Sequence, residues 1–215
     1  WAAQAEADAP AAELSCIGVD VARGGKDQTV LALRYGRWIA PLRKHPGTAT
    51  PDGPAVAGLV VAAHPGQAVV HVDVIGVGSS AYDSLRGAGV QAVGVNFGAG
   101  SDRRDRGGNL GFANLRAEAY WALREALDPA YDPDLALPPD EQLLADLTAL
   151  KWRPAGRRVQ VEHKEEIAKR IGRSTDCGDA VALAVWTSGS YVSTEYQAQG
   201  PGGGHTVDPW ATARW

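Results

Sequence analysis

Short apolar runs separated by turn residues dominate the first part of the chain. The runs at 14–21, 29–35 and 38–42 are rich in Val, Leu and Ile and are bounded by Gly-containing turns, a pattern that predicts β-strands. Because the connections between these runs are short, we expect the three strands to be antiparallel neighbours.

The next segments alternate between helical and strand patterns. Apolar positions at helical spacing predict helices over 54–63 and 79–87, and apolar runs predict strands over 68–74 and 90–95. Strands that alternate with helices generally pair in parallel. The pattern therefore predicts an α/β fold with a central mixed sheet, in which three antiparallel strands are followed by parallel strands and helices flank the sheet.

The second half of the chain is mainly helical. Leu115, Ala119 and Leu123 line one face of a predicted helix over 113–127. Two segments that flank Pro154-Ala155-Gly156 predict the arms of a hairpin, at 148–152 and 158–161. Shorter helices are predicted at 140–147, 165–171 and 176–186.

Composition favours one globular domain with a tail at each end. Hydrophobic residues make up 45% of the 215 residues and charged residues 21%, both near the globular average, which excludes a disordered chain or a coiled coil. Residues 1–13 are Ala-rich and acidic, and residues 191–215 contain Pro-Gly-Gly-Gly without an apolar face. Both segments are predicted to be linkers or tails around a domain at 14–190.

Charge and cysteine content restrict the class of protein further. The formal charge of −4 excludes a protein that coats nucleic acid with its whole surface, so any DNA-binding site must be local. Cys16 and Cys177 have no neighbours at zinc or Cys-x-x-Cys spacing, which predicts reduced thiols. No apolar run approaches the roughly 18 residues of a membrane helix, and no basic signal peptide is present, so we expect a soluble protein that is not secreted. Because the sequence has no Met, even at position 1, we expect it to be a piece of a longer protein.

Two aspartates lie in strands that are otherwise apolar. Asp20 follows Ile17-Gly18-Val19, and Asp73 follows a similar run at 69–72. Burying an ionised carboxylate is costly unless it is paired or bound to a metal. Phosphodiester cleavage by two metal ions requires carboxylates that converge from separate elements, and two strand ends in one sheet can supply them. The alternative is that each aspartate only caps the turn after its strand.

A third acid lies in the first turn of the last predicted helix. The helix dipole stabilises a negative charge at Asp179 whether or not this residue has a function. Asp176 lies three residues earlier on nearly the same face and could cap the helix while Asp179 points into the site. Asp176 is therefore the reserve acid.

Four motifs follow one another along the chain. They are Ile17-Gly18-Val19-Asp20-Val21-Ala22-Arg23-Gly24-Gly25 with Asp27-Gln28-Thr29-Val30, His71-Val72-Asp73-Val74-Ile75-Gly76-Val77-Gly78, Asn114-Leu115-Arg116-Ala117-Glu118 with Tyr120-Trp121, and Gly172-Arg173-Ser174-Thr175-Asp176-Cys177-Gly178-Asp179-Ala180. In this order they resemble the C-terminal nuclease domain of tailed-bacteriophage terminase large subunits, a member of the ribonuclease H-like superfamily. The resemblance extends over most of the predicted domain.

The resemblance implies a ribonuclease H-like fold and a metal-dependent DNA endonuclease that cuts concatemeric viral DNA during genome packaging. It implies that Asp20, Asp73 and Asp179 are the catalytic residues and the ligands of two Mg²⁺ or Mn²⁺ ions. The implied partners are double-stranded DNA, an N-terminal packaging ATPase domain of the full-length protein, the portal protein and the small terminase subunit, in the cytoplasm of an infected bacterium and without a membrane. This sequence contains no Gly-x-x-x-x-Gly-Lys-[Ser/Thr] motif, so DNA translocation is not expected of it.

Local charge indicates where DNA would bind. Between 151 and 173, eight basic residues accompany three acids, a local charge of +5 in a chain of −4. Basic patches of this kind bind phosphates, although a solvated hairpin and helix face would have a similar composition. A loop at 98–109 with three arginines is a second candidate surface. The DNA-binding candidates are Lys151, Arg153, Arg157, Arg158 and Lys164.

Three other functions fit part of the sequence. A junction resolvase or transposase of the ribonuclease H-like kind would share the acids but would act on branched or end-specific DNA. A docking module would contact the portal or the packaging motor without cutting DNA. A nicotinamide or flavin oxidoreductase is the third. Gly76, Gly78 and Ala81 follow a strand with the spacing of a dinucleotide-binding site, but Asn96-Phe97 stand where the acid that binds the ribose is expected.

Overall fold

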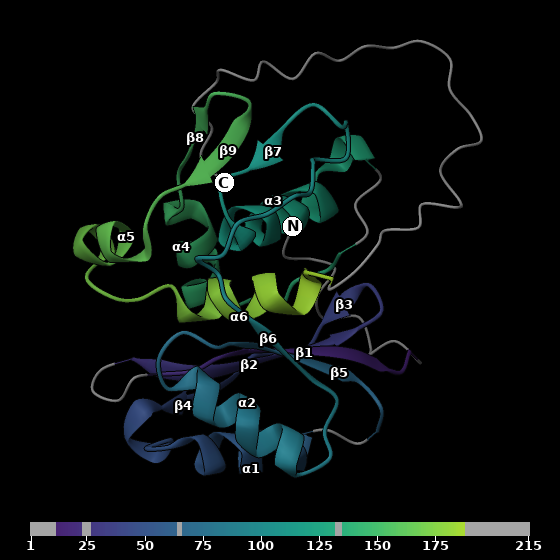
Figure 1. Cartoon of the computed structure of the whole chain (residues 1–215), viewed down its shortest axis with the longest axis vertical. Helices are drawn as coiled ribbons and strands as arrows, with labels where there is room; N and C mark the ends of the chain where they lie inside the picture. The colour runs from purple at the N-terminus through teal and green to yellow at the C-terminus, as the bar shows by residue number, and fades with distance from the viewer. Residues whose placement is uncertain (1–11, 23–26, 64–65, 132–134, 188–215) are drawn as a thin grey trace.

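The computed structural model describes residues 12–22, 27–63, 66–131 and 135–187. Its elements form layers (Figure 1). Two helices, α1 (Gly53–Ala63) and α2 (Gly78–Gly87), cover one face of a large sheet, and α6 (Asp176–Val185) crosses the other face.

The large sheet has six strands within the described residues, in the order β3-β2-β1-β5-β6 with β4 also paired to β2. β2 is antiparallel to β1, β3 and β4, whereas β5 is parallel to both β1 and β6. The predicted mixed sheet is confirmed, and it differs from the mostly parallel sheet of dinucleotide-binding folds. The strands are β1 (Leu14–Asp20), β2 (Gln28–Tyr35), β3 (Trp38–Ile39), β4 (Arg43–Pro46), β5 (Val69–Asp73) and β6 (Ala92–Val95).

The sequence pattern missed β4. We predicted one strand over 38–42, but β3 ends at Ile39 and a new strand begins at Arg43. Pro41 lies between them and has no N–H group with which to continue the ladder. Since β4 has the sequence Arg-Lys-His-Pro, it carries no apolar alternation from which a strand could be predicted.

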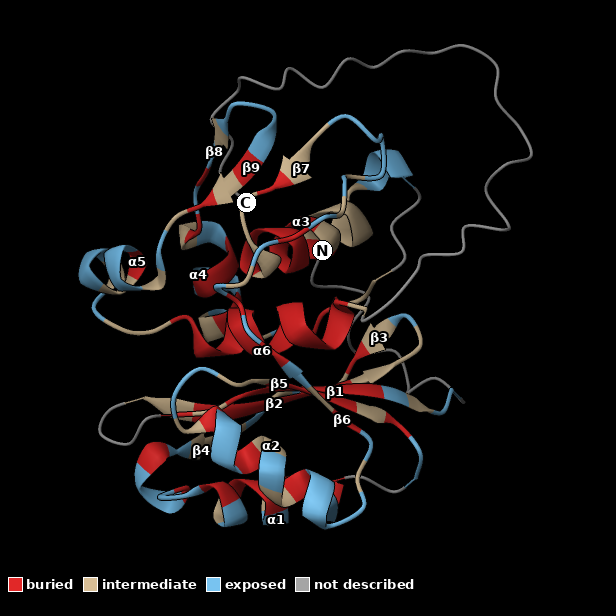
Figure 2. Ribbon diagram, in the orientation of Figure 1, coloured by how far each residue is buried: buried red, intermediate tan, exposed pale blue. Residues whose placement is uncertain are grey.

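Helix α6 is buried along its whole length (Figure 2). It packs on β1 and β2 on one side and on α3 (Leu115–Leu127) and α4 (Glu141–Ala149) on the other. A Cβ atom at Gly18 would lie 2.0 Å from the carbonyl oxygen of Ala180, so this close approach requires glycine. Contact on all sides explains why the helix lacks a polar face after Asp179.

A second, smaller sheet lies beyond α3 and α4 (Figure 1). It contains β7 (Gly111–Phe112), β9 (Arg158–Val161) and β8 (Trp152–Ala155), in that order. The predicted hairpin exists, but its first arm was placed wrongly. Thr148 belongs to α4, and Pro154 pairs with Val159 inside the hairpin, so the turn is reduced to Gly156-Arg157.

The remaining elements connect these layers. Helix α5 (Lys164–Ile171) follows the hairpin. The part of the chain that the structure describes also contains two short 3₁₀ helices, η1 (Gly47–Ala49) and η2 (Pro129–Tyr131). Cys16 and Cys177 are free and buried, and burial raises the pKa of each thiol to about 12. None of the described helices is long and apolar enough to cross a membrane. The predicted tails at 1–13 and 191–215 lie almost wholly outside the described residues.

Candidate functional site

The ends of β1 and β5 and the start of α6 meet at one cavity of about 550 Å³. β1 and β5 are parallel neighbours in which Val19 pairs with Val72, so Asp20 and Asp73 follow at the same edge of the sheet. Asp20, Asp73 and Asp176 line the cavity. Asp179 lies one turn further along α6, buried behind Lys164.

Asp20 is almost completely buried, with 4% of its surface exposed. Its Oδ2 atom lies 3.2 Å from Nζ of Lys164. Burial raises the pKa of the Asp20 carboxyl well above its usual range, and the negative charges of Asp179, Asp176 and Asp73 add to this effect, while Lys164 opposes it. An acid in this environment is stable as a carboxylate only with a cation beside it.

Asp73 is fixed by the turn that follows β5. Its Oδ1 atom accepts the backbone N–H of Ile75 at 3.1 Å. Gly76 has φ = 75°, and a Cβ atom on Gly78 would lie 1.7 Å from the Asp73 carbonyl oxygen, so both positions require glycine. These glycines, noted above for a dinucleotide motif, here shape the turn that orients Asp73. Burial raises the pKa of Asp73 as well.

Asp179 receives more protein contacts than the other acids. Oδ1 accepts hydrogen bonds from Tyr120 Oη at 2.8 Å and Arg116 Nε at 3.2 Å. Oδ2 accepts one from Thr175 Oγ1 at 2.9 Å and forms an ion pair with Lys164 Nζ at 3.0 Å. Although burial acts in the opposite direction, Lys164 and Arg116 hold the pKa of Asp179 below its usual range, so this residue is a permanent carboxylate.

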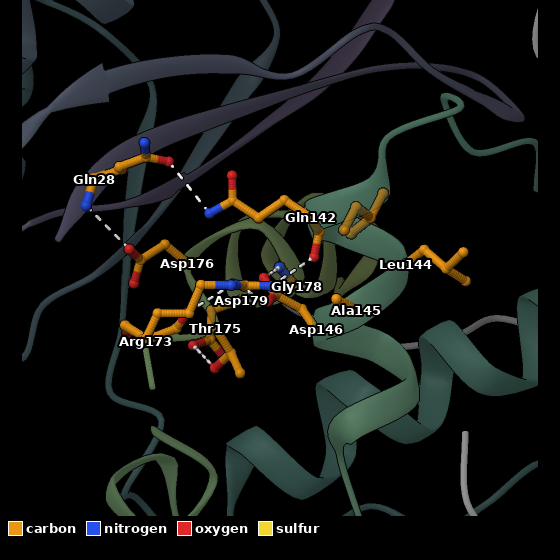
Figure 3. Close-up of polar contacts among 12 residues, drawn as sticks. Gln28, Gln142, Leu144, Ala145, Asp146, Arg173, Thr175, Asp176, Gly178 and Asp179 are labelled. Atoms are coloured by element: carbon orange, nitrogen blue, oxygen red, sulfur yellow. Dashed lines mark hydrogen bonds and ion pairs between the residues drawn. The ribbon is translucent and has the colours of Figure 1, made fainter. Parts of the chain in front are cut away.

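The structure does not support a capping role for Asp176. Thr175 occupies the N-cap position of α6, and the Asp176 carboxylate instead accepts the backbone N–H of Gln28 at 3.0 Å (Figure 3). Asp176 Oδ1 also lies 3.5 Å from Lys164 Nζ. The reserve acid thus joins β2 to α6 at the wall of the cavity.

Lys164 lies among these carboxylates, at the first position of α5. Its ammonium nitrogen is within 3.5 Å of oxygens of Asp20, Asp176 and Asp179. Although burial lowers the pKa of Lys164, the acids raise it well above its usual range, so the side chain is fully charged. The charge of Lys164 is therefore engaged inside the site, whereas DNA binding by this residue stays a prediction.

The other four DNA-binding candidates lie together on the hairpin. Lys151, immediately before β8, and Arg153, Arg157 and Arg158 are all exposed. Arg153 Nε donates to Gln160 Oε1 at 3.2 Å across the two strands. Only two residues separate the end of β9 from Lys164, so the hairpin leads directly into the site.

A polar network between α4 and α6 supports the start of α6 (Figure 3). Arg173 is bonded to the carboxylate of Asp146 and donates to the backbone oxygen of Gln142 at 3.1 Å. Asp146 Oδ2 accepts the backbone N–H of Gly178 at 3.0 Å. Burial raises the pKa of Asp146 to about 6. This network fixes the turn that carries Asp176 and Asp179.

Sequence alone predicts no role for four residues that the structure places around these acids, namely Arg116, Tyr120, Asp146 and Thr175. Arg116 and Tyr120 are one turn apart on a helix that is otherwise apolar on that side. This spacing is the sequence feature from which a buried role of the two residues could be predicted. A charged residue on a predicted buried face requires a partner. The identity of the acidic partner depends on contacts between α3 and α6, and the hydrophobic periodicity of the sequence does not predict these contacts.

The donor types fit a hard divalent ion, since all four acids offer carboxylate oxygens. Lys164 shows that a positive charge is already accommodated between Asp20, Asp176 and Asp179. Among the residues that the structure describes, however, no group of three His, Cys, Asp or Glu side chains is spaced to hold a metal ion. The acids are gathered around the ammonium group rather than preassembled for metal.

Several solved structures share this architecture. The nuclease domain of the large terminase subunit gp2 of bacterial virus Sf6 is similar with a TM-score of 0.66 and 20% identity, over 83% of this chain and 90% of that chain. A mutant of the same Sf6 domain with manganese and beta-thujaplicinol gives a TM-score of 0.66 at 18% identity, with the same coverage. The large terminase nuclease from thermophilic phage G20c with bound magnesium gives 0.55 at 19% identity, over 82% of each chain.

This chain has the fold of the phage large-terminase nuclease domain. The predicted ribonuclease H-like α/β architecture is thereby confirmed. No protein-family model and no curated protein matches the sequence. Within the terminase nuclease fold, the three acids predicted from sequence do converge, and Asp176 and Lys164 join them.

Proposed function

We propose that this domain is a metal-dependent endonuclease that hydrolyses phosphodiester bonds of double-stranded DNA as part of a viral terminase large subunit. The observation that carries the proposal is the convergence of aspartates from β1, β5 and α6 on one open cavity in the terminase nuclease fold. The raised pKa values of Asp20 and Asp73 support it, because a buried and a half-buried acid beside further carboxylates favour a bound cation.

Asp20, Asp73 and Asp179 would hold the metal, with Asp176 as a further oxygen donor. Two Mg²⁺ or Mn²⁺ ions, when bound, activate a water molecule and stabilise the leaving oxygen of the phosphodiester. The protein's own contribution is to fix the carboxylates. The Ile75 N–H orients Asp73, and the Gln28 N–H orients Asp176.

Lys164 keeps the site assembled without metal. Its ammonium group compensates Asp20 and Asp179, which would otherwise repel each other across a poorly solvated space. A third of its side chain is exposed, so the lysine can leave this position toward the cavity. There its charge would face the phosphate of a bound DNA strand.

The exposed bases of the hairpin would guide DNA to the cavity. Lys151, Arg153, Arg157 and Arg158 project from one hairpin, and the strand β9 leads from it to Lys164. In a chain of net charge −4, such a local patch is what allows a DNA backbone to approach the acids.

The same proposal extends to the packaging context. The domain would act beside a packaging ATPase domain of a longer chain and would meet the portal protein and the small terminase subunit in the cytoplasm of an infected bacterium. The concatemeric viral genome would be its substrate.

The proposal is tested by incubating the purified chain with supercoiled plasmid in Mg²⁺, Mn²⁺ or EDTA. Nicked and linear DNA should form with either ion and not in EDTA, and Asp20→Asn should be inactive in all three. Plasmid that stays intact with both ions would refute the nuclease proposal and favour a docking module. Cleavage of four-way junctions alone would instead indicate a junction resolvase.

A further inference from the structure

The two carboxylate oxygens of Asp179 have different partners. Oδ1 accepts from Tyr120 Oη and Arg116 Nε, both on α3. Oδ2 accepts from Thr175 Oγ1 and faces Lys164 Nζ. Because each carboxylate oxygen has about two lone-pair sites, the donors on α3 fill Oδ1 completely.

The partners of Oδ1 are fixed on their other sides. Arg116 Nη1 donates to the backbone oxygen of Glu162 at 2.8 Å, and Nη2 lies 3.4 Å from Thr175 Oγ1. The guanidinium group also stacks over the Tyr120 ring, 4.9 Å from its centroid. Tyr120 and Asp179 are each 1% exposed, so water cannot replace these donors.

The packing of α6 makes room for the tyrosine hydroxyl. A Cβ atom at position 178 would lie 2.9 Å from Tyr120 Oη, a distance that real Cβ contacts do not show, so Gly178 is required beside Asp179. A phenol is protonated at neutral pH, so the Tyr120 hydroxyl remains a donor to Oδ1. Oδ1 therefore faces two permanent donors.

Oδ2 differs in one respect. Thr175 is buried and part of the helix start. Among the described residues, Lys164 is the only partner of Asp179 with a third of its side chain exposed. Of the four acceptor sites on this carboxylate, the one that faces Lys164 can thus become available to another cation. The same ammonium group also contacts Asp20.

We infer that Arg116 and Tyr120 are positioning residues that reserve Oδ1, so that Asp179 binds a divalent ion through Oδ2 alone. The inference rests on the proposed function and specifies how one of its ligands works. A carboxylate limited to one oxygen suits the octahedral site of Mg²⁺ or Mn²⁺, whereas Ca²⁺ readily takes both oxygens of one carboxylate. Arg116 and Tyr120 would therefore make the site selective against Ca²⁺.

The test is to measure metal binding to the whole chain without DNA. Mn²⁺ affinity is obtained by titration with detection of free Mn²⁺ by electron paramagnetic resonance, and Ca²⁺ affinity by displacement of Mn²⁺. Tyr120→Phe removes the hydroxyl and keeps the ring. We expect about tenfold weaker Mn²⁺ binding, the size typical when a residue that orients a metal ligand is lost. We also expect Ca²⁺ affinity to fall less or to rise, so that the ratio of Ca²⁺ to Mn²⁺ affinity increases.

Three further variants make the result specific. Tyr82→Phe, on α2 at the other face of the large sheet, is the matched control and should leave both affinities unchanged. In an Asp179→Asn background, Tyr120→Phe should no longer change the ratio, because the positioning role requires the hydroxyl to donate to this carboxylate. Arg116→Gln should change the ratio in the same direction as Tyr120→Phe and replaces it as the test if that variant does not fold.

The outcomes separate this inference from the proposed function. Equal weakening of Mn²⁺ and Ca²⁺ in Tyr120→Phe, or an effect that persists with Asn at position 179, would overturn the positioning role while leaving a metal site intact. A wild-type chain that binds no Mn²⁺ in an Asp20-dependent manner would overturn the proposed function itself.

Discussion

The ammonium nitrogen of Lys164 lies 3.0 Å from Oδ2 of Asp179, the oxygen at which we expect a divalent ion to bind. The two cations would therefore compete for one carboxylate oxygen. Because the same ammonium group also contacts Asp20, its departure exposes carboxylates from β1 and α6 together. Metal binding and movement of Lys164 should be a single coupled event.

Replacing Lys164 with Ala should make stability depend on metal. Without metal, the variant should lose about 1–2 kcal/mol of unfolding free energy, less than for a fully buried pair because a third of the lysine side chain is exposed. Mn²⁺ should then raise its melting temperature more than that of the wild type. Thermal unfolding with EDTA and with Mn²⁺ measures both effects. Lys169→Ala, at an exposed position of the same helix, is the control, and equal Mn²⁺ shifts in all three proteins would contradict the prediction.

Asp20→Asn should abolish cleavage without unfolding the domain. Since burial raises the pKa of Asp20, the folded state holds this proton more tightly than the unfolded state. Metal-free wild-type protein should therefore lose stability as the pH rises from about 4, the usual pKa of an aspartate, through the raised value. The amide does not titrate, so the variant should match the wild type near pH 4 and be at least as stable at pH 7.

Urea unfolding in EDTA between pH 4 and pH 7, together with plasmid cleavage, tests this prediction. Asp83→Asn, on the exposed side of α2, should change neither activity nor the pH dependence of stability. A variant of Asp20 that is unfolded at neutral pH would show that the carboxylate is needed for the fold.

Reversing the charge of the hairpin should weaken binding to all DNA sequences alike. Arg157→Glu with Arg158→Glu removes two bases that lie at the hairpin turn, so fewer counterions are released on binding. The slope of log affinity against log salt concentration should flatten by about 2. Mn²⁺ affinity without DNA should not change, because neither residue contacts the acids.

A matched double variant controls for net charge. Arg86 is exposed on α2, and Arg43 alternates with Lys44 in β4, so that it points away from the α4 contact of Lys44. Arg43→Glu with Arg86→Glu should leave DNA affinity nearly unchanged. If both double variants weaken binding equally, the patch on the hairpin has no special role, and the loop at 98–109 becomes the alternative DNA-binding surface.

Gly18→Ala should be strongly destabilising, because the added Cβ would lie 2.0 Å from the backbone oxygen of Ala180, which cannot move without shifting α6. We expect a loss of about 3 kcal/mol or more. Gly58→Ala in the exposed middle of α1, where an added Cβ meets nothing within 4 Å, should instead stabilise by about 0.5–1 kcal/mol. Chemical denaturation of the two variants compares them directly, and a mild effect at position 18 would mean that α6 packs less closely on β1.

Most of the large sheet could be predicted from sequence because its strands are short apolar runs between turns. β1 and β5 are of this kind, and the aspartate that ends each one stands out against its neighbours. The polar strand β4 and the two-residue strand β7 could not be predicted, since neither has a hydrophobic period. β4 is held by its pairing with β2 in the large sheet, and β7 by its pairing with β9, which comes much later in the chain.

Of the residues in the site, only the acids could be predicted from the sequence. Asp20, Asp73 and Asp179 could be identified because carboxylates are unusual in apolar segments. Lys164 belongs to a basic segment of 23 residues, and composition alone placed it with the exposed bases. Its inward position follows from the tertiary contact between the start of α5 and the start of α6, for which periodicity contains no information.

The burial of α6 also sets the order in which the molecule can be completed during synthesis. This helix fills the space between the large sheet and the layer of α3 and α4, yet it is the last described helix to leave the ribosome. Until it emerges, the apolar face of β1 and β2 has no cover, and the carboxylates of Asp20 and Asp73 have neither Asp176 nor Asp179 beside them. A nascent chain that has not yet reached residue 185 is therefore both prone to aggregate and without an assembled site.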